Sequence, residues 1–375
     1  MKSIWKMTGL ILVSSCLLMS CVKTSVLEKL GLTVAVGYDL LQKDKLNVTS
    51  VLINPSVESK KKSEIITSEA NSNKGARINI NNMSSHTLVS GQVRVVLFDD
   101  QLGKQGISVI IDNLSRDPFF GDMIFLAISD GSSNELLSHD YSQIPDIGMY
   151  LYEMLQQHIE DDWVPSCTVQ DYRSALYSIG GDPILPILHK KDDSVEISGL
   201  ALFSDDKVVG TIAPGEAYLL KLLQGKQKTD LKEISIDRNE LHPFLLKKRE
   251  GTVRVVISNI GSKTRFRLTS VQKLEFHVNV HMNVELQEIT DHYDFRNPKA
   301  KTLLEQKIGK ALSKETDRLI QKLQRMNSDA IGFGKVYRST VRGSNLSRDK
   351  WHGMFPSAKI HSHFKVNIIR TGTTE

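Results

Sequence analysis

The sequence contains little cysteine. Its three cysteines are Cys16, Cys21 and Cys167, in a chain of 375 residues. If Cys16 leaves with a cleaved signal peptide and Cys21 is acylated, only Cys167 keeps a free thiol. The mature chain can then form no intramolecular disulfide, and a cysteine-rich metal site is excluded. Its stability must come from packed hydrophobic cores.

Catalytic motifs are also missing. The sequence has no G-x-S-x-G elbow, no phosphate-binding P-loop and no H-E-x-x-H zinc motif. The acidic pairs Asp192-Asp193 and Asp205-Asp206 flank expected hairpin turns, where aspartate is favoured because it bonds to the local backbone. We therefore predict no enzymatic activity and no cofactor, with an extracytoplasmic hydrolase as a minor alternative.

Charge of either sign is only weakly in excess. The formal net charge is +5, and loss of Lys2 and Lys6 with a signal peptide leaves +3 by side chains. This balance is too mild to indicate a nucleic-acid partner, which usually needs a strongly basic chain. It is compatible with a body beside an anionic membrane surface.

The sequence has no hydrophobic run long enough to span a membrane. Its longest hydrophobic run lies at the N-terminus. Residues 7–19 are apolar and follow Lys2 and Lys6. This run of about 13 residues is too short for a membrane span, which needs about 20. A cationic start, an apolar middle and a small residue before the cleavage point are typical of a secretory signal. We therefore predict a cleaved signal peptide over residues 1–20.

The signal ends in Leu18-Met19-Ser20-Cys21, a pattern similar to a bacterial lipobox. Such a site predicts cleavage after Ser20 and transfer of diacylglycerol to the Cys21 thiol, because a thiolate is a good nucleophile. A lipidated Cys21 carries two acyl chains, which anchor a protein stably. The chain is thus predicted to be lipid-anchored at Cys21 on the outer face of a membrane. An ordinary signal with an incidental cysteine is the alternative.

Chain length and pattern predict the α+β class, with three mixed α/β domains after the signal peptide. Residues 21–190 form an N-terminal α/β domain, residues 191–225 a small hairpin-and-helix segment or domain, and residues 226–375 a C-terminal α+β domain. In the first, a strand over 92–98, an acidic N-cap at Asp99-Asp100, a helix over 101–114 and a strand over 123–128 favour a β-α-β-α run. In the last, a long amphipathic helix over 299–323 follows strands over 253–258, 264–268 and 274–286.

Four histidines form the one residue pattern in the sequence that could indicate a metal site. His277 and His281 alternate with Asn279 on one strand face, and His361 and His363 alternate on the last strand. If these strands paired, four imidazoles could converge on zinc. Lys359 and Lys365 share the face of His361 and His363, so a solvent-facing polar stripe on an antiparallel sheet is the favoured interpretation. We predict no metal site.

An ordered set of short motifs resembles one family, the Ger(x)C lipoproteins. These are the C subunits of the nutrient germinant receptors of bacterial endospores. The resemblance covers nearly the full chain. It is carried by the lipobox at Cys21 and, in order, by Gly37-Tyr38-Asp39, Gly181-Asp182-Pro183, residues 198–203, residues 206–210, Asp329, Gly332-Phe333-Gly334, Trp351 and Phe355-Pro356. Many members have Trp-Asp after the lipidated cysteine, where this chain has Val22-Lys23.

The resemblance implies a non-catalytic subunit on the outer face of the spore inner membrane. It would act beside integral-membrane A and B subunits in a complex that senses amino acids, sugars or nucleosides. Only Cys21 receives a role from the family, and no residue is assigned to nutrient binding. A lipid-anchored extracytoplasmic solute-binding protein is the alternative function.

Overall fold

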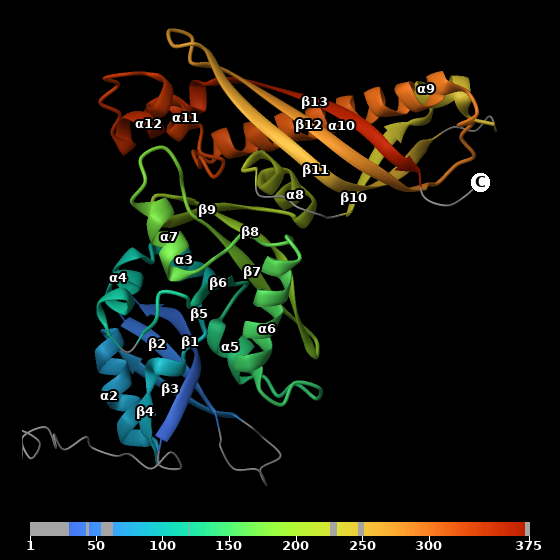
Figure 1. The fold of residues 1–375 in the computed structure, drawn as a ribbon. Coiled ribbons are helices and arrows are strands. Elements are labelled where there is room, and N and C mark those ends of the chain that lie inside the picture. Colours follow the sequence, from blue (N-terminus) through green and yellow to red (C-terminus); the bar gives the residue numbers. More distant parts are fainter. Residues whose placement is uncertain are drawn as a thin grey trace, which may run out of the picture.

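Two β-sheets, one above the other in Figure 1, organise the chain. The computed structural model describes residues 30–42, 45–53, 63–118, 120–225, 231–246 and 251–371. The predicted signal peptide and the lipobox with Cys21 lie outside the described residues. The α+β class is confirmed, because both sheets are packed with helices.

The first sheet has parallel strands at its centre and antiparallel strands at both ends. Its order is β3-β2-β1-β5-β6-β7-β8-β9, with β4 also paired to β1. The strands β1, β5, β6 and β7 run parallel. The bounds are β1 (Leu30–Gln42), β2 (Lys45–Ile53), β3 (Ser63–Ala70), β4 (Thr87–Val89), β5 (Val95–Asp99), β6 (Phe125–Ser129), β7 (Ile184–Lys191), β8 (Ser194–Ser204) and β9 (Lys207–Ile212).

Helices cover both faces of this sheet. Val96 and Phe98 of β5 pack towards α2 (Asn73–Met83), α3 (Asp100–Gln105), α4 (Ser108–Arg116) and α7 (Val169–Leu176). Val95 and Leu97 pack towards α5 (Ser133–Ser138) and α6 (Ile147–Glu160) on the other face. A parallel strand that is buried on both faces usually has a continuous apolar sequence, and β5 has such a sequence. A short 3₁₀ turn, η2 (Ser90–Gln92), precedes β5.

The expected β-α-β-α run is confirmed, with one difference. The predicted helix over 101–114 is two helices, because Gly106 has φ +124° and ends α3. Asp99 caps α3 as predicted, since its carboxylate accepts a hydrogen bond from Leu102 N at 2.8 Å. Burial raises the pKa of Asp99 to about 6, and the nearby Asp39 and Asp100 carboxylates act in the same direction.

The second sheet has four strands in the order β10-β11-β12-β13. The first three pair antiparallel, whereas β13 runs parallel to β12. This corrects the expectation of an antiparallel sheet, because the long connection between β12 and β13 allows a crossover. The bounds are β10 (Leu231–Asp237), α9 (Arg238–Leu241), η3 (His242–Phe244), β11 (Thr252–Ser270), β12 (Glu275–Ile289), α10 (Pro298–Arg325), α11 (Phe333–Thr340), α12 (Arg348–Met354), η4 (Phe355–Ser357) and β13 (Lys359–Thr371).

Helix α10 has its apolar stripe on the sheet, as predicted, with Leu304, Ile308 and Leu312 buried. Two strands expected over 253–258 and 264–268 are one strand, β11. The glycine between them does not end the strand, since the pairing with β12 only shifts register between Asn259 and Gly261. A bulge of this kind bends a strand without breaking it.

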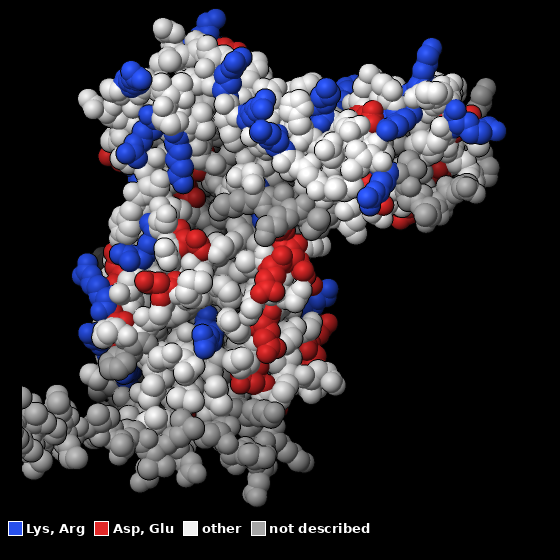
Figure 2. Space-filling model, in the orientation of Figure 1, with Lys and Arg blue, Asp and Glu red and all other residues white. Residues whose placement is uncertain are grey.

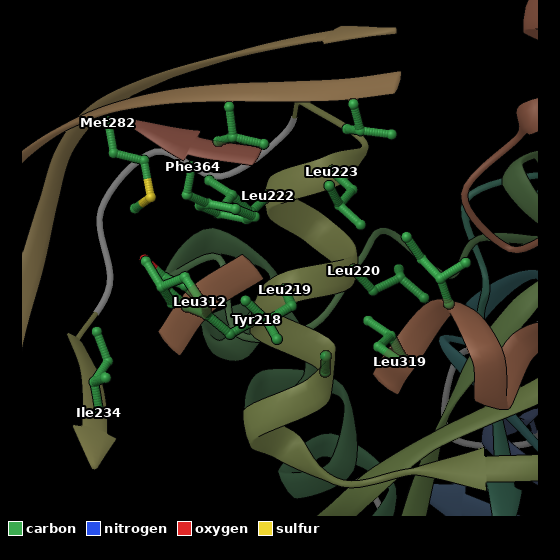
Figure 3. Packing of buried hydrophobic residues seen from close by; sticks show 14 of the residues in the cluster. Tyr218, Leu219, Leu220, Leu222, Leu223, Ile234, Met282, Leu312, Leu319 and Phe364 are labelled. Atoms are coloured by element: carbon green, nitrogen blue, oxygen red, sulfur yellow. The ribbon is translucent and has the colours of Figure 1, made fainter. Parts of the chain in front are cut away.

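Residues 191–225 link the two sheets. Strands β8 and β9 extend the first sheet, while α8 (Pro214–Leu223) is buried beneath the second. In Figure 3, Leu222 of α8 lies with Met282 and Phe364 from the second sheet and Leu312 from α10. The segment thus shares the cores of both neighbours. The division into three domains stays a prediction.

In the part of the chain that the structure describes, no helix has the length and apolar character needed to cross a membrane.

Candidate functional site at the junction of the two sheets

The loop before β7 and the segment before α11 are joined by backbone hydrogen bonds. Asp182 N donates to Asp329 O at 3.1 Å, and Lys335 N donates to Gly180 O at 3.0 Å. In the opposite direction, Asp329 N donates to a carboxylate oxygen of Asp182 at 2.7 Å. These bonds fix the two sheets relative to each other. Gly180, Asp182 and Asp329 are buried, so their backbone groups are not easily exchanged for water.

Two glycines allow this close approach. A Cβ on Gly180 would lie 2.3 Å from the carbonyl carbon of Gly334, and a Cβ on Gly334 would lie 2.3 Å from Gly180 Cα. Such distances leave no room for any side chain. Gly180 also has φ +88°, a conformation that other residues adopt only with strain. The junction therefore requires glycine on both sides.

The carboxylate of Asp329 organises the junction from within. It is fully buried and accepts hydrogen bonds from Gly332 N, Phe333 N, Gly334 N and Trp351 Nε1, at 2.8 to 2.9 Å. Burial raises the pKa of Asp329 to about 6, and the Asp182 charge adds to this, while the three backbone donors oppose it. One side chain thus holds the start of α11 against α12.

Asp182 is the second buried carboxylate of the junction. Besides Asp329 N, it accepts from Asp205 N at 3.2 Å and faces His352 Nε2 at 3.2 Å. The hydrogen bond to Asp182 raises the pKa of His352, and the charges of Asp182 and Asp205 add to the effect. Arg348 donates to Asp205 at 2.9 Å. Residues from the β8–β9 turn and α12 therefore meet on one charged network.

Aromatic rings close the junction on its apolar side. Phe333 lies 5.4 Å from Phe276 and 6.3 Å from Phe355 between ring centroids. Trp351 stacks at a tilt 5.8 Å from Phe355. Edge-to-face and tilted contacts of this kind stabilise beyond the area they bury. They exclude water from the Asp329 carboxylate.

The motif Gly37-Tyr38-Asp39 builds a separate polar cluster in the first sheet. The Asp39 carboxylate accepts from Ser133 N at 2.6 Å and Asn134 N at 2.9 Å, and so caps α5. A Cβ on Gly37 would lie 2.5 Å from Ser133 Oγ. Tyr38 donates its hydroxyl proton to Asn73 Oδ1 at 2.6 Å. The three residues therefore fix helices to β1, and each has a packing role.

A polar cleft of about 330 Å³ adjoins the junction. It lies between α7 and the α11 segment, and its lining includes Asp171, Ser174, Gly181, Ala330 and Lys335. The carboxylate of Asp171 accepts from Thr168 Oγ1 at 2.6 Å, so it serves the helix cap. The hydroxyl of Ser166, which also lines the cleft, donates to the same carboxylate. The cleft can hold a small polar molecule.

The predicted histidines share one sheet face but do not converge as a group of four. His277 pairs with His361, with ring centroids 5.3 Å apart. His281 lies opposite Lys365, and His363 lies opposite Asn279. Across the described residues, no three His, Cys, Asp or Glu side chains form a group able to hold a metal ion. The four imidazoles are exposed, which favours the polar-stripe interpretation.

Asp192-Asp193 and Asp205-Asp206 lie in hairpin turns, as predicted, with Asp192 and Asp205 at positive φ. Sequence reasoning missed that Asp205 belongs to the junction, and it gave Asp329 no role. The only available signal was the set of motifs 181–183, 329–334 and 351–356. The structure brings these segments together at one place.

Two family models match almost the whole chain. One, described as "Spore germination protein N-terminal domain", matches residues 23–190. The other, described as "Spore germination B3/ GerAC like, C-terminal", matches residues 198–372. The chain belongs to the Ger(x)C family of spore germination proteins.

Similar proteins extend this finding. The chain is 27% identical over 368 residues to the spore germination protein GerQC of Bacillus cereus, covering 98% of this chain and 99% of the relative. It is 20% identical to the putative spore germination protein YfkR of Bacillus subtilis, covering 77% and 73%. A solved structure titled GerBC matches with a TM-score of 0.53 at 14% identity, covering 89% and 96%. That structure shows a shared fold. Of the Ger(x)C motifs named above, Gly181-Asp182-Pro183, Asp329, Gly332-Phe333-Gly334 and Trp351 meet at the junction described here.

Gly180→Ala should destabilise the protein by at least about 2 kcal/mol, because the new methyl group overlaps the Gly334 backbone and the positive φ adds strain. Gly353→Ala is the matched control, since a Cβ there meets nothing within 4 Å. Urea unfolding of both variants measures the difference. Equal midpoints would show that the close glycine contact is not required.

His352→Gln should reduce the dependence of stability on pH. The pKa of His352 is raised in the folded state, so its contribution is present below its ordinary pKa of about 6.5 and is lost as pH rises through the folded-state value. We expect the variant to lose on the order of 1 kcal/mol at pH 5.5 and little at pH 8.5. Urea unfolding across this range, with the exposed His242→Gln as control, measures the effect. A pH-independent deficit would contradict it.

Proposed function

We propose that this chain is a lipid-anchored, non-catalytic subunit of a nutrient germinant receptor needed for spore germination. The observation that carries the proposal is the end-to-end match to a named spore germination protein, together with two family models that follow each other along the chain. A match of this coverage favours the same domain arrangement and the same role. The proposed partners are integral-membrane A and B subunits and membrane lipid.

The anchor is proposed at Cys21, after cleavage behind Ser20. Chain length alone limits the distance between Cys21 and Leu30 to about 32 Å. Leu30, the first residue of β1, pairs with Thr87 of β4, and Figure 1 shows β4 at the end of the first sheet away from the second sheet. An anchored chain would therefore keep its first sheet nearest the membrane and present its second sheet further out. Tethering would also raise its effective concentration beside membrane partners.

The chemistry of the junction supports a non-catalytic role. The carboxylates of Asp329 and Asp182 are occupied by backbone and side-chain donors. Their arrangement holds two bodies together. We propose that this rigidity lets the subunit act as one body in the receptor complex.

A lipid-anchored solute-binding protein is the second candidate, and the polar cleft beside the junction favours it. Calorimetry of the purified chain with nutrient mixtures separates the two candidates. Tight binding of a nutrient by this chain alone would support the solute-binding function. An absence of heat with every mixture would support the receptor-subunit function.

Cys21→Ala should abolish membrane anchoring. Intact-mass spectrometry of the wild-type membrane fraction should show a chain that begins at Cys21 and carries added diacylglycerol mass. The variant should lack this mass and leave the membrane fraction, because no acyl chain remains to partition into lipid. A wild-type chain that is cleaved, unlipidated and found in the soluble fraction would contradict the anchor.

Deletion of the chain should abolish the response of spores to at least one nutrient germinant. The fall in optical density of spore suspensions after nutrient addition measures germination. Germination by a non-nutrient trigger serves as the control for spore viability. Unchanged germination with every nutrient tested would overturn the receptor function.

A further inference from the structure

One face of the second sheet is buried and the other is open. Along β12, Phe276, Val278 and Val280 are buried in the core that α10 completes. The residues between them, His277, Asn279 and His281, point to the opposite side, because side chains alternate along a strand. The helices described above leave this outer face uncovered.

Strand register gathers basic side chains on the outer face. On β11, Lys263, Arg265 and Arg267 lie opposite His281, Asn279 and His277. On β13, Lys365, His363 and His361 lie opposite the same three residues. We call this set, with Lys359 at its end, the basic face. Its members from all three strands are Lys263, Arg265, Arg267, His277, His281, Lys359, His361, His363 and Lys365.

Among the described residues, the charge of the basic face is only partly neutralised. Lys263, Arg265 and Arg267 are exposed and have no acidic partner among the described residues. Lys359 and Lys365 are also exposed and form no ion pair among the described residues, although Lys359 lies opposite Glu275 in register and Lys365 lines a hollow together with Glu305. Acidic side chains are few along the face. Glu275 lies 3.6 Å from His277 and 3.8 Å from His361, Glu285 pairs in register with Arg370, and Glu305 of α10 borders the face beside Lys365.

Charge is also segregated between the two halves of the chain. Residues 226–375 contain 29 Lys and Arg against 16 Asp and Glu, a net +13. Residues 21–225 contain 17 against 27, a net −10. Figure 2 shows Lys and Arg spread over the second-sheet body and a strip of Asp and Glu on the first-sheet body. The mild total charge conceals this asymmetry.

We propose that the basic face docks an acidic protein surface rich in aspartate and glutamate. The face is polar and carries few apolar groups, so charge complementarity and not a hydrophobic patch would select its partner. The second sheet lies at the end of the molecule away from β4 (Figure 1), with which Leu30 pairs, and this favours a protein over the membrane that holds the proposed anchor. The inference goes beyond the proposed function, and its test does not require lipidation.

Binding should be measured by fluorescence anisotropy with a labelled twelve-residue Asp/Glu-rich peptide and the purified full chain. A Gln/Asn-rich peptide of the same length is the uncharged control. Arg265→Glu with Arg267→Glu should weaken binding of the acidic peptide by about tenfold or more, because two attractions become repulsions. Affinity should also fall as salt rises, since exposed charges are screened.

Lys74→Glu with Arg116→Glu is the matched control variant. It changes net charge by the same amount at exposed sites on α2 and α4 of the first body, and should alter binding by less than about twofold. Lys263→Gln with Lys365→Gln removes charge without reversal and provides the test if the first variant fails to fold. Equal weakening by the face and control variants would overturn the proposal.

Two further outcomes would also overturn it. If the peptide does not bind, and vesicles of anionic phospholipid bind the wild type but not the face variant, the basic face is a membrane surface. If sedimentation shows a wild-type oligomer that the face variant loses, its partner is the acidic half of a second copy. Selective loss of peptide binding in the face variant, with a monomeric wild type, supports docking of an acidic protein.

Discussion

The buried carboxylate of Asp329 is the interaction on which the arrangement of the two sheets depends. It accepts four hydrogen bonds, three of them from consecutive backbone amides at the start of α11. A buried charge is costly unless it is fully satisfied. The donors lie on three consecutive residues before and at the start of α11 and on Trp351 of α12. The free-energy cost of burying the carboxylate is therefore offset only when both segments are in place. The carboxylate thus stabilises one arrangement at the expense of all others.

The glycines and the helix α8 extend the same constraint. Gly180 and Gly334 let two backbones meet, which places Asp182 within reach of both Asp329 N and His352. On the other side of the junction, α8 follows the last strand of the first sheet yet packs under the second. Lys221 of α8 is buried and bonded to Asp162 at 3.2 Å. Polar and apolar contacts therefore join the two bodies into one unit.

This arrangement fits the proposed role of a receptor subunit that presents surfaces to partners. The first body leads towards the proposed anchor, and the second body carries an open, basic sheet face. The network at the junction holds a fixed distance and orientation between them. The same chemistry also makes the junction sensitive to pH, because the pKa of His352 and that of Asp329 are both raised.

The sequence by itself determined the fold class, the main elements and the family. Local signals sufficed there: β5 is continuously apolar because helices cover both its faces, Asp99 caps the next helix, and the stripe of α10 repeats at helical spacing. The ordered motifs identified the Ger(x)C resemblance. The sequence also suggested that the histidines share strand faces, since alternation alone places them there.

Only the tertiary structure decided how distant residues meet. Nothing local indicates that Gly180 must face Gly334, that Asp205 of a turn joins Asp182 and His352, or that β13 lies parallel to β12. The basic face illustrates the reason. Lys263, Arg265 and Arg267 lie on β11, which pairs with one side of β12, while β13 pairs with the other side. The register of these strands is set by the residues of the buried face and not by those of the exposed face. Non-local packing therefore decided which charges share a surface.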